Sequence, residues 1–235
     1  MGAGGAGEWT MRRFWTAIVA ALSLAACASV PEDIAIGPDS NRSLIVIAVA
    51  APATAPPLPE FSVTIARFAA AEGRLDAGLT GGWARVNSAD RDADGRYWLV
   101  GQAEPGEYVI SDLSHQSLWH ACFNAGTRAF TVAPGQVVFL GALDPVPALQ
   151  VMALTLPSVS MNSEHLFAMD QEVDFIPPGS VTNWQAPVEA FVRTNFPNVT
   201  APITTVESRP VTFNTGRDLF GLQRVCGGYY APANE

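Results

Sequence analysis

The chain contains no lysine. All 13 of its basic residues are arginines, which stand against 22 acidic residues and leave a formal net charge of −9. A nucleic-acid-binding protein needs clustered positive charge to neutralise phosphates, so this balance argues against a nucleic acid as partner. Charged residues make up only 15% of the chain, whereas hydrophobic residues make up 49%. This composition argues against a disordered chain or a coiled coil and indicates a globular protein.

The sequence also lacks the common motifs of catalysis. It has no GxSxG nucleophile elbow, no Walker phosphate-binding loop and no GxGxxG motif ahead of a helix. Its three histidines leave few side chains that can act as general bases near neutral pH. We therefore expect a non-enzymatic protein that needs no cofactor.

One apolar run lies near the N-terminus. Residues 14–24 carry no charge, follow Arg12 and Arg13, and lead into the small residues Ala25 and Ala26. The run is shorter than the roughly 20 apolar residues that a membrane-spanning helix needs. A basic flank, a short apolar run and small residues in this order predict a signal peptide over residues 1–26.

The end of this leader, Leu24-Ala25-Ala26-Cys27, resembles the bacterial lipobox, in which the cysteine thiol receives diacylglycerol and the leader is cut off before it. The resemblance implies a lipoprotein that is anchored through Cys27. Ala28 stands where an aspartate retains some lipoproteins in the inner membrane, so the similarity implies the outer membrane, with the body in the periplasm. Because the body is acidic, its attachment is expected from acyl chains rather than from charge. The alternative is an ordinary secretory leader that happens to precede a cysteine.

An exported chain folds in an oxidising compartment, where disulfides persist. Cys122 and Cys226 are the only cysteines besides Cys27, so they form the candidate pair. The alternative is two buried thiols, which pack as small apolar residues.

The pattern of apolar residues over residues 44–156 predicts a domain built from strands. Residues 44–50 form a continuous apolar run rich in β-branched residues, typical of a strand buried on both faces, and residues 61–66 alternate between apolar and polar or small residues, as a half-buried strand does. Six to eight strands in this region favour an antiparallel β-sandwich. The other strand candidates are residues 97–100, 108–110, 129–132, 137–140 and 150–156.

Two connectors in this region contain a Pro-Gly pair, Pro105-Gly106 and Pro134-Gly135. Proline holds φ near −65°, and glycine accepts the positive φ that the next position of a type II turn requires. Both pairs therefore predict tight turns that reverse the chain into hairpins.

The flanking segments differ from this domain. Residues 27–43 show no sustained apolar period and predict a flexible tether. Residues 187–196 predict a short amphipathic helix, because apolar residues share one face, namely Val188, Phe191, Val192 and Phe196. No linker rich in Ser and Gly sets residues 157–235 apart, so we expect a C-terminal extension that packs on the sandwich.

The order of these motifs resembles a known family. A strand at residues 44–50, the turn and strand at Pro105–Tyr108, and the turn at Ala133–Gly135 before residues 137–140 are similar to the transthyretin-like β-sandwich domain, which is related to carboxypeptidase regulatory domains and occurs in many bacterial lipoproteins. The resemblance implies the fold and an envelope location, and it implies no catalytic residues.

Two groups of residues are weak candidates for metal ligands. Asp90, Asp92 and Asp94 have the spacing of the first half of a calcium loop, but Gly101 stands at the twelfth position in place of the bidentate glutamate. A complete EF-hand is therefore excluded, and a solvated hairpin turn is favoured.

The second group contains His115, His120 and Cys122, with His165 further along the chain. A zinc site needs three or four converging ligands, and the sequence has no HExxH motif. A structural role of these histidines is therefore favoured, and no metal is expected.

The chain also has six tryptophans, which are typical of cores and of sugar-stacking platforms; four of them are Trp83, Trp98, Trp119 and Trp184. Together these observations predict a non-enzymatic outer-membrane lipoprotein that serves as an envelope structural or interaction module, with an envelope protein or a glycan as partner. The alternatives are a lipoprotein that binds glycan or peptidoglycan and a metal-assisted hydrolase.

Overall fold

The computed structural model describes residues 33–50, 58, 60–77, 81–88, 92, 94–116, 118–155, 165–169, 172–218 and 220–228. The predicted leader over residues 1–26 and the predicted lipidation site Cys27 lie outside these residues. The described part of the chain is mainly β. None of its helices is both long and apolar enough to cross a membrane.

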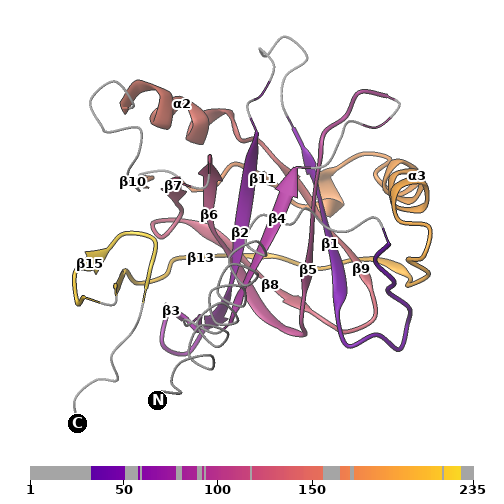
Figure 1. Cartoon of the computed structure of the whole chain (residues 1–235), viewed down its shortest axis with the longest axis horizontal. Helices are drawn as coiled ribbons and strands as arrows, with labels where there is room; N and C mark the ends of the chain where they lie inside the picture. Colours follow the sequence, from indigo (N-terminus) through magenta and orange to yellow (C-terminus); the bar gives the residue numbers. More distant parts are fainter. Residues whose placement is uncertain are drawn as a thin grey trace, which may run out of the picture.

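The elements follow one another along the chain in an order dominated by strands (Figure 1). The strands are β1 (Ser43–Val49), β2 (Phe61–Ala69), β3 (Arg74–Leu75), β4 (Trp83–Ser88), β5 (Trp98–Ala103), β6 (Gly106–His115), β7 (Trp119–Cys122), β8 (Thr127–Val132), β9 (Val137–Leu143), β10 (His165–Ala168), β11 (Phe175–Ile176), β12 (Ile203–Thr205), β13 (Arg209–Val211), β14 (Gly216–Arg217) and β15 (Gln223–Arg224). The helices are α2 (Val146–Thr155), the 3-10 helix η3 (Pro178–Ser180) and α3 (Gln185–Asn195).

Most strands join one curled sheet in the order β10-β7-β6-β2-β4-β5-β1-β9-β11. In addition, β8 pairs with β6, β12 with β9, β13 with β8 and β3 with β2. The pairs of β2 with β4 and β6 are antiparallel, as are those of β1 with β5 and β6 with β7. However, β1 runs parallel to β9, β7 to β10, and β9 to β12. The sheet is therefore mixed, and the expectation of purely antiparallel pairing is wrong for these three pairs.

The curl lets β1 bury both of its faces, as its apolar run predicts. Ile45 and Ile47 point into an inner core between the two halves of the sheet. Leu44 and Val46, on the opposite face, belong to an outer core beneath α3. All four side chains are fully buried. Because successive side chains of a strand point to opposite faces, one strand serves two cores.

The inner core is enclosed by β1, β5 and β9 on one side and by β2, β6, β7 and β8 on the other. Helix α2 covers one end of it (Figure 1), with Ala148 and Met152 buried against the sheet. The prediction of a strand over residues 150–156 is therefore wrong for its described part. Asp144 Oδ1 accepts a hydrogen bond from the backbone N–H of Val146 at 2.8 Å, which caps the helix. The following Ala, Leu, Gln and Met residues favour a helix.

The predicted amphipathic helix is confirmed as α3, and its residues Val188, Phe191 and Val192 are buried. The helix lies on the outer face of β1, β5 and β9. Phe191 stacks on Trp98 with 5.0 Å between the ring centroids. Such pairs add specific geometry to the apolar area that the helix buries.

Segments at both ends of the chain belong to this body. Within the predicted tether, Ile34 and Ile36 are buried in the outer core, and Ile36 forms an isolated bridge with Val199. The second half of residues 27–43 therefore packs on the body, because two closely spaced isoleucines bury apolar surface there. The C-terminal extension likewise supplies β10 to β13 of the same sheet.

The two Pro-Gly connectors behave differently from the prediction. Gly135 has a φ of +67°, as a type II turn requires, whereas Gly106 is not among the glycines with positive φ and begins β6. Moreover, β5 does not pair with β6, nor β8 with β9. The prediction of hairpins is therefore wrong, because both connectors carry the chain from one half of the curled sheet to the other.

We expect Gly135→Ala to lower the free energy of unfolding more than Gly221→Ala. Both glycines have positive φ, which costs an alanine about 1–2 kcal/mol. A Cβ at Gly135 would also collide with the backbone of Pro38, whereas one at Gly221 would meet nothing within 4 Å. This overlap is expected to add about 1–3 kcal/mol. Urea unfolding of both variants measures the difference, and equal losses would contradict the close approach of Pro38.

Candidate functional site

A row of polar side chains crosses the outer face of β4, β2, β6 and β7. In the strand register, Thr64 lies opposite Arg85 on one side and opposite Asp112 on the other. Asp112 in turn lies opposite Cys122 on β7. Residues paired in this way project from the same face of a sheet. The neighbouring residue Val63 points to the inner core instead. Successive side chains of β2 therefore alternate between an apolar inner face and a polar outer face.

A second row runs beside the first. Ser62 lies opposite Ser114, and Ser114 lies opposite His120. The hydroxyl oxygens of Ser62 and Ser114 are 2.7 Å apart and share a hydrogen bond. Both serines are buried, so the bond between them removes the cost of leaving two hydroxyls unpaired.

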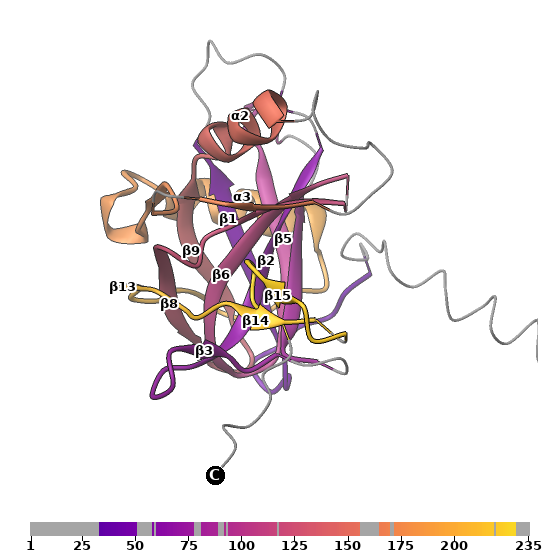
Figure 2. The ribbon, with the colours of Figure 1, turned by 90° about the vertical axis from the view of Figure 1, so that its left-hand side faces the viewer.

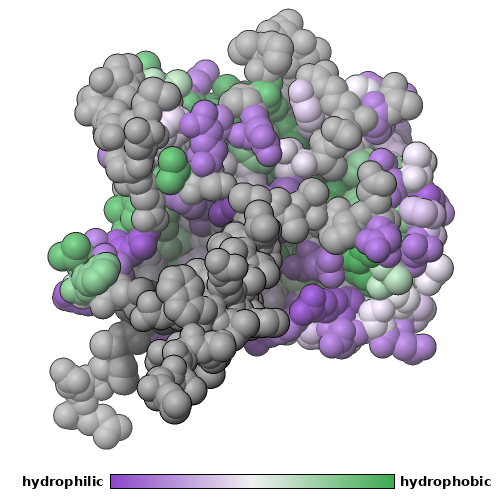
Figure 3. Space-filling view, viewed as in Figure 1, coloured by the Kyte–Doolittle hydropathy of each residue, from purple (hydrophilic) through white to green (hydrophobic). Residues whose placement is uncertain are grey.

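The C-terminal segment, defined as residues 220–228, lies across this polar face (Figure 2). A disulfide joins Cys226 to Cys122 on β7, with 4.9 Å between the Cα atoms, and the two cysteines are separated by 104 residues along the chain. The segment begins with a hairpin turn in which Phe220 and Leu222 are exposed. Figure 3 shows hydrophobic surface at this edge of the molecule.

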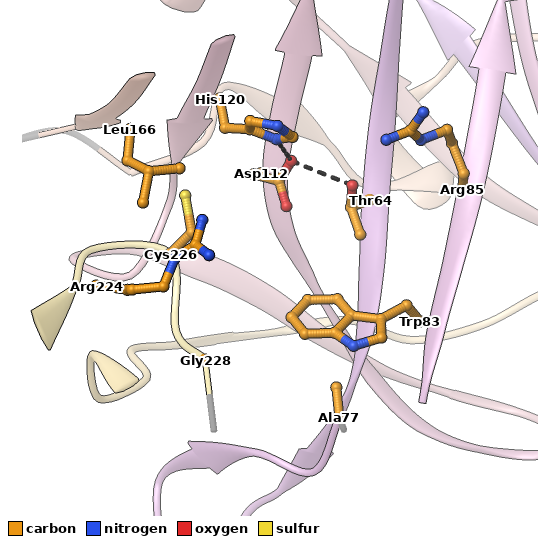
Figure 4. Close-up of a pocket in the computed structure, with 10 residues that line it drawn as sticks. All are labelled: Thr64, Ala77, Trp83, Arg85, Asp112, His120, Leu166, Arg224, Cys226 and Gly228. Atoms are coloured by element: carbon orange, nitrogen blue, oxygen red, sulfur yellow. Dashed lines mark hydrogen bonds and ion pairs between the residues drawn. The ribbon is translucent and has the colours of Figure 1, made fainter. Parts of the chain in front are cut away.

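A cavity of about 360 Å³ lies between the C-terminal segment and the polar face of the sheet. Figure 4 shows the side chains that surround it. Strands β2, β4, β6, β7 and β10 and the C-terminal segment all contribute, so residues far apart in the sequence meet here. The lining residues are Thr64, Ala77, Trp83, Arg85, Asp112, His120, Leu166, Arg224, Cys226 and Gly228.

Asp112 is the centre of the hydrogen bonds in the cavity. Its carboxylate is buried and accepts from Thr64 Oγ1 at 3.1 Å, from Ser111 Oγ at 2.8 Å and from His120 Nδ1 at 3.0 Å. When its carboxylate is ionised, Asp112 only accepts hydrogen bonds, and His120 then carries a proton on Nδ1. Asp112 thereby fixes the orientation of the His120 ring, and in the neutral imidazole Nε2 is the remaining acceptor.

Charged side chains of both signs line the cavity. Among the described lining residues, Arg85 and Arg224 are basic and Asp112 is acidic. The two arginine side chains point toward the Asp112–His120 pair from opposite sides of the cavity (Figure 4).

Trp83 is the tryptophan that lines the cavity, and its side chain is 40% exposed. Of the other three considered from the sequence, Trp98 and Trp119 are buried in the cores, and Trp184 stacks on Phe139 with 5.1 Å between the ring centroids. Among these four, Trp83 is the one that lines this cavity.

The candidate metal ligands do not converge. His115 Nδ1 lies 2.7 Å from the backbone oxygen of Glu60. His165 lies beside Phe167 in a tilted arrangement, with 6.3 Å between the ring centroids, and is not among the residues that line the cavity with His120. Among the described residues, no three His, Cys, Asp or Glu side chains are grouped so that they could hold a metal ion.

The predicted aspartate loop is a turn tied to the outer core. Asp90 lies outside the described residues. Asp92 Oδ2 accepts from the indole N–H of Trp98 at 2.9 Å, and Oδ1 accepts from the backbone N–H groups of Asp94 and Arg96. Burial raises the pKa of Asp92, but these hydrogen bonds and the charge of Arg96 lower it by more, so the pKa lies below its ordinary value. The carboxylate therefore serves as a cap for protein N–H groups.

Sequence reasoning missed most residues of the cavity. Of the residues that the sequence singles out, Trp83, His120 and Cys226 line the cavity, and Cys122 holds its wall through the disulfide. Asp112, Arg85 and Arg224 were not singled out. Asp112, Leu113 and Ser114 alternate between polar and apolar residues, which is a sequence signal for the face on which Asp112 lies, whereas residues 83–88 show no clear alternation.

No family model, curated protein or solved structure matches this chain. The cavity is therefore interpreted from its own chemistry.

We expect loss of the disulfide to loosen the wall of the cavity. A bond that closes a loop of about 100 residues stabilises a protein by about 2–5 kcal/mol. The double variant Cys122→Ser/Cys226→Ser should lose free energy of unfolding in this range. Amide hydrogen exchange should rise over residues 223–228 and stay nearly unchanged in α3. Reductant should affect the original chain and leave the double variant unchanged; an equal response of both would contradict the role of the bond.

The lowered pKa of Asp92 predicts a pH-dependent contribution to stability. The contribution is fully present above the ordinary value of 3.8 and is lost as the pH falls through the lower pKa of the folded state. Asp92→Asn should therefore cost about 1 kcal/mol at pH 7, and the difference should shrink below pH 3.8. The matched control is Asp94→Asn, whose side chain is 70% exposed and should change stability by less than about 0.5 kcal/mol. A cost of Asp92→Asn that is the same at both pH values would rule out this account.

Proposed function

We propose that the chain is a non-enzymatic lipoprotein, held at the outer membrane through acylated Cys27, and that its exported body is an interaction module whose binding site is the cavity under the C-terminal segment. The observation that carries the binding role is a cavity of about 360 Å³ that residues from distant parts of the chain line with charged, polar and aromatic side chains. The anchoring role rests on the lipobox at Leu24–Cys27.

The Cys122–Cys226 disulfide supports export. Such bonds persist in the periplasm and outside the cell, and thiols stay reduced in the cytosol of most bacteria. The disulfide therefore agrees with the predicted signal peptide, because both indicate that the chain is exported.

The hydrogen bonds in the cavity favour binding over catalysis. A serine nucleophile is activated by a hydrogen bond to its base. On this face, however, Ser62 bonds to Ser114, and the hydroxyls of Thr64 and Ser111 donate to Asp112 rather than to His120. The polar groups thus hold one another in place, which suits a preformed site that recognises a ligand.

A glycan is the favoured class of ligand, and an envelope protein is the alternative partner. Trp83 favours the glycan, because its exposed ring at the cavity offers a face on which a sugar can stack. The metal-assisted hydrolase has no comparable support among the residues that the structure describes.

For the fold, we propose that the curled sheet is a variant of the transthyretin-like sandwich. Its two halves face each other across the inner core, as the two layers of a sandwich do. The Pro-Gly connectors before β6 and β9 pass from one half of the sheet to the other. In a sandwich, connections of this kind join the two layers.

The proposed anchor holds the body near the membrane. Only six residues separate Cys27 from Ile34, which is already buried in the outer core. Seven residue steps span at most about 25 Å when fully extended. The outer core beneath α3 is therefore the part of the body that this anchor places nearest to the lipid surface.

We expect Cys27→Ser to abolish acylation. When the full-length chain is expressed in a bacterium that carries the lipoprotein-processing enzymes, labelled palmitate should be incorporated into the original chain and not into this variant. The variant should also leave the membrane fraction, because the acidic body has no other expected attachment. Cys122→Ser/Cys226→Ser, which keeps the lipobox, is the control and should retain the label. Acylation of the Cys27→Ser variant would overturn the anchor.

A further inference from the structure

We propose that the Cys122–Cys226 disulfide is a site of thiol–disulfide exchange, at which a dithiol enters the cavity, reduces the bond and releases the C-terminal segment from the sheet. This inference goes beyond the proposed function, because it makes access to the cavity depend on the redox state of the two cysteines. It rests on the position of one sulfur at the cavity and on the small apolar area that the segment buries.

The two cysteines differ in how a reductant can reach them. Cys122 on β7 is fully buried, whereas Cys226 keeps 9% of its surface exposed and lines the cavity. Figure 4 shows the sulfur of Cys226 among the side chains that surround this space. The rate of exchange depends on which sulfur an attacking thiolate can reach. The attack is therefore assigned to Cys226 Sγ, with Cys122 Sγ as the leaving group.

The reaction consumes one dithiol and has two steps. In the first, one thiolate of the dithiol forms a bond to Cys226 Sγ, the bond between the two cysteine sulfurs breaks, and Cys122 leaves as a thiolate. In the second, the other thiolate attacks the dithiol sulfur of this mixed disulfide, and Cys226 leaves as a thiolate. The dithiol loses two electrons and becomes a disulfide, the protein disulfide gains these electrons, and the two protons of the dithiol pass to the cysteines.

The C-terminal segment is held on the sheet by little apolar burial. Among the described residues beyond Phe213, Cys226 is the only hydrophobic side chain that is buried. The large side chains of Phe220 and Leu222 face solvent instead and are 88% and 66% exposed. Polar contacts at such an exposed edge add little to stability. The disulfide is therefore the main attachment of the segment.

The chain is fixed to the body just before this segment. Phe213 is buried in an apolar cluster on the outer face of the sheet, and its backbone N–H donates to the oxygen of Asn124 at 3.1 Å. The backbone N–H of Asn214 donates to the oxygen of Gly73 at 2.8 Å. Release after reduction is therefore limited to the residues beyond 214.

The residues beyond 214 keep a structure of their own. Strands β14 and β15 pair with each other, and Asp218 Oδ1 accepts hydrogen bonds from the backbone N–H groups of Phe220 and Leu222, both at 2.9 Å. Because these bonds lie within the hairpin, breaking the disulfide releases the hairpin as a unit.

Reduction thereby opens the cavity. The Asp112–His120 pair and Thr64 lie on the sheet, and the segment forms the opposite wall. Without the bond this wall leaves, and the polar face of the sheet becomes accessible to larger partners. Disulfides that a thiol can reach are the ones that serve as labile or regulatory bonds.

The first test is the rate of reduction of the full-length protein in non-ionic detergent under native conditions. Dithiothreitol represents a free dithiol and reduced thioredoxin a dithiol on a protein, so the faster reductant identifies the source. We expect the rate to rise in proportion to reductant concentration, because the attack occurs without global unfolding. A rate that levels off at the rate of global unfolding would overturn the inference.

Glutathione, a monothiol, tests which sulfur is attacked. The reaction is stopped early with acid, and peptide mass spectrometry locates the mixed disulfide. We expect glutathione on Cys226, since this sulfur lies at the cavity. Glutathione on Cys122 in equal or greater amount would contradict attack from the cavity.

Limited proteolysis tests the release of the segment. The chain has no lysine, so trypsin cuts only after arginine. After reduction and alkylation, cleavage after Arg224 should become at least about ten-fold faster, whereas cleavage after Arg128 on β8 should not change. The double variant Cys122→Ser/Cys226→Ser should show the same fast cleavage after Arg224 without reductant, and dithiothreitol should not increase it.

Two outcomes of the proteolysis would also overturn the inference. Unchanged cleavage after Arg224 in the reduced chain would mean that the segment stays on the sheet without the bond. An equal increase after Arg128 would mean that reduction unfolds the whole body. Both are measured on the chain without substitutions, so they do not depend on whether a variant folds. Neither uses labelled palmitate or a glycan, so their failure is distinguishable from a failure of the proposed function.

Discussion

Burial of both faces of one curled sheet is the constraint on which the rest of the structure depends. The inner face closes on a core that the sheet itself surrounds, with α2 at one end. The outer face of β1, β5 and β9 is covered by α3 and by the segment around Ile36. Each half of the sheet therefore needs a cover from another part of the chain, and residues before β1 and beyond β9 supply it. Hydrophobic burial of this extent is the dominant favourable contribution to folding.

The other half of the outer face has two parts. One is an apolar cluster on β2, β6 and β8 that includes Ala66, Val109 and Ala129 and packs against Phe213. The other presents hydroxyls, a carboxylate and an imidazole, and a short segment without a core of its own covers it. A covalent bond between Cys122 and Cys226 holds this segment in place. The consequence is a polar cavity with one wall from the sheet and one from the C-terminal segment, in which hydrogen bonds to Asp112 fix the orientation of His120.

The cavity brings together charged side chains from distant parts of the chain. Arg85 reaches it from the sheet and Arg224 from the C-terminal segment, on opposite sides of Asp112 (Figure 4). The proposed anchor at Cys27 and this cavity lie on different parts of the molecule, since Ile34 joins the outer core beneath α3 and the cavity lies on the other half of the sheet.

The sequence by itself determined the features that depend on neighbouring residues. The apolar run of β1, the alternation in β2 and the helical spacing of Val188, Phe191 and Val192 each identify an element and its buried face, because strand and helix periods act within a few residues. Only the tertiary structure decided which strands pair, that the Pro-Gly connectors pass between sheet halves, and that Arg85 and Arg224 share a cavity. These outcomes depend on contacts between distant segments, for which local patterns carry no signal.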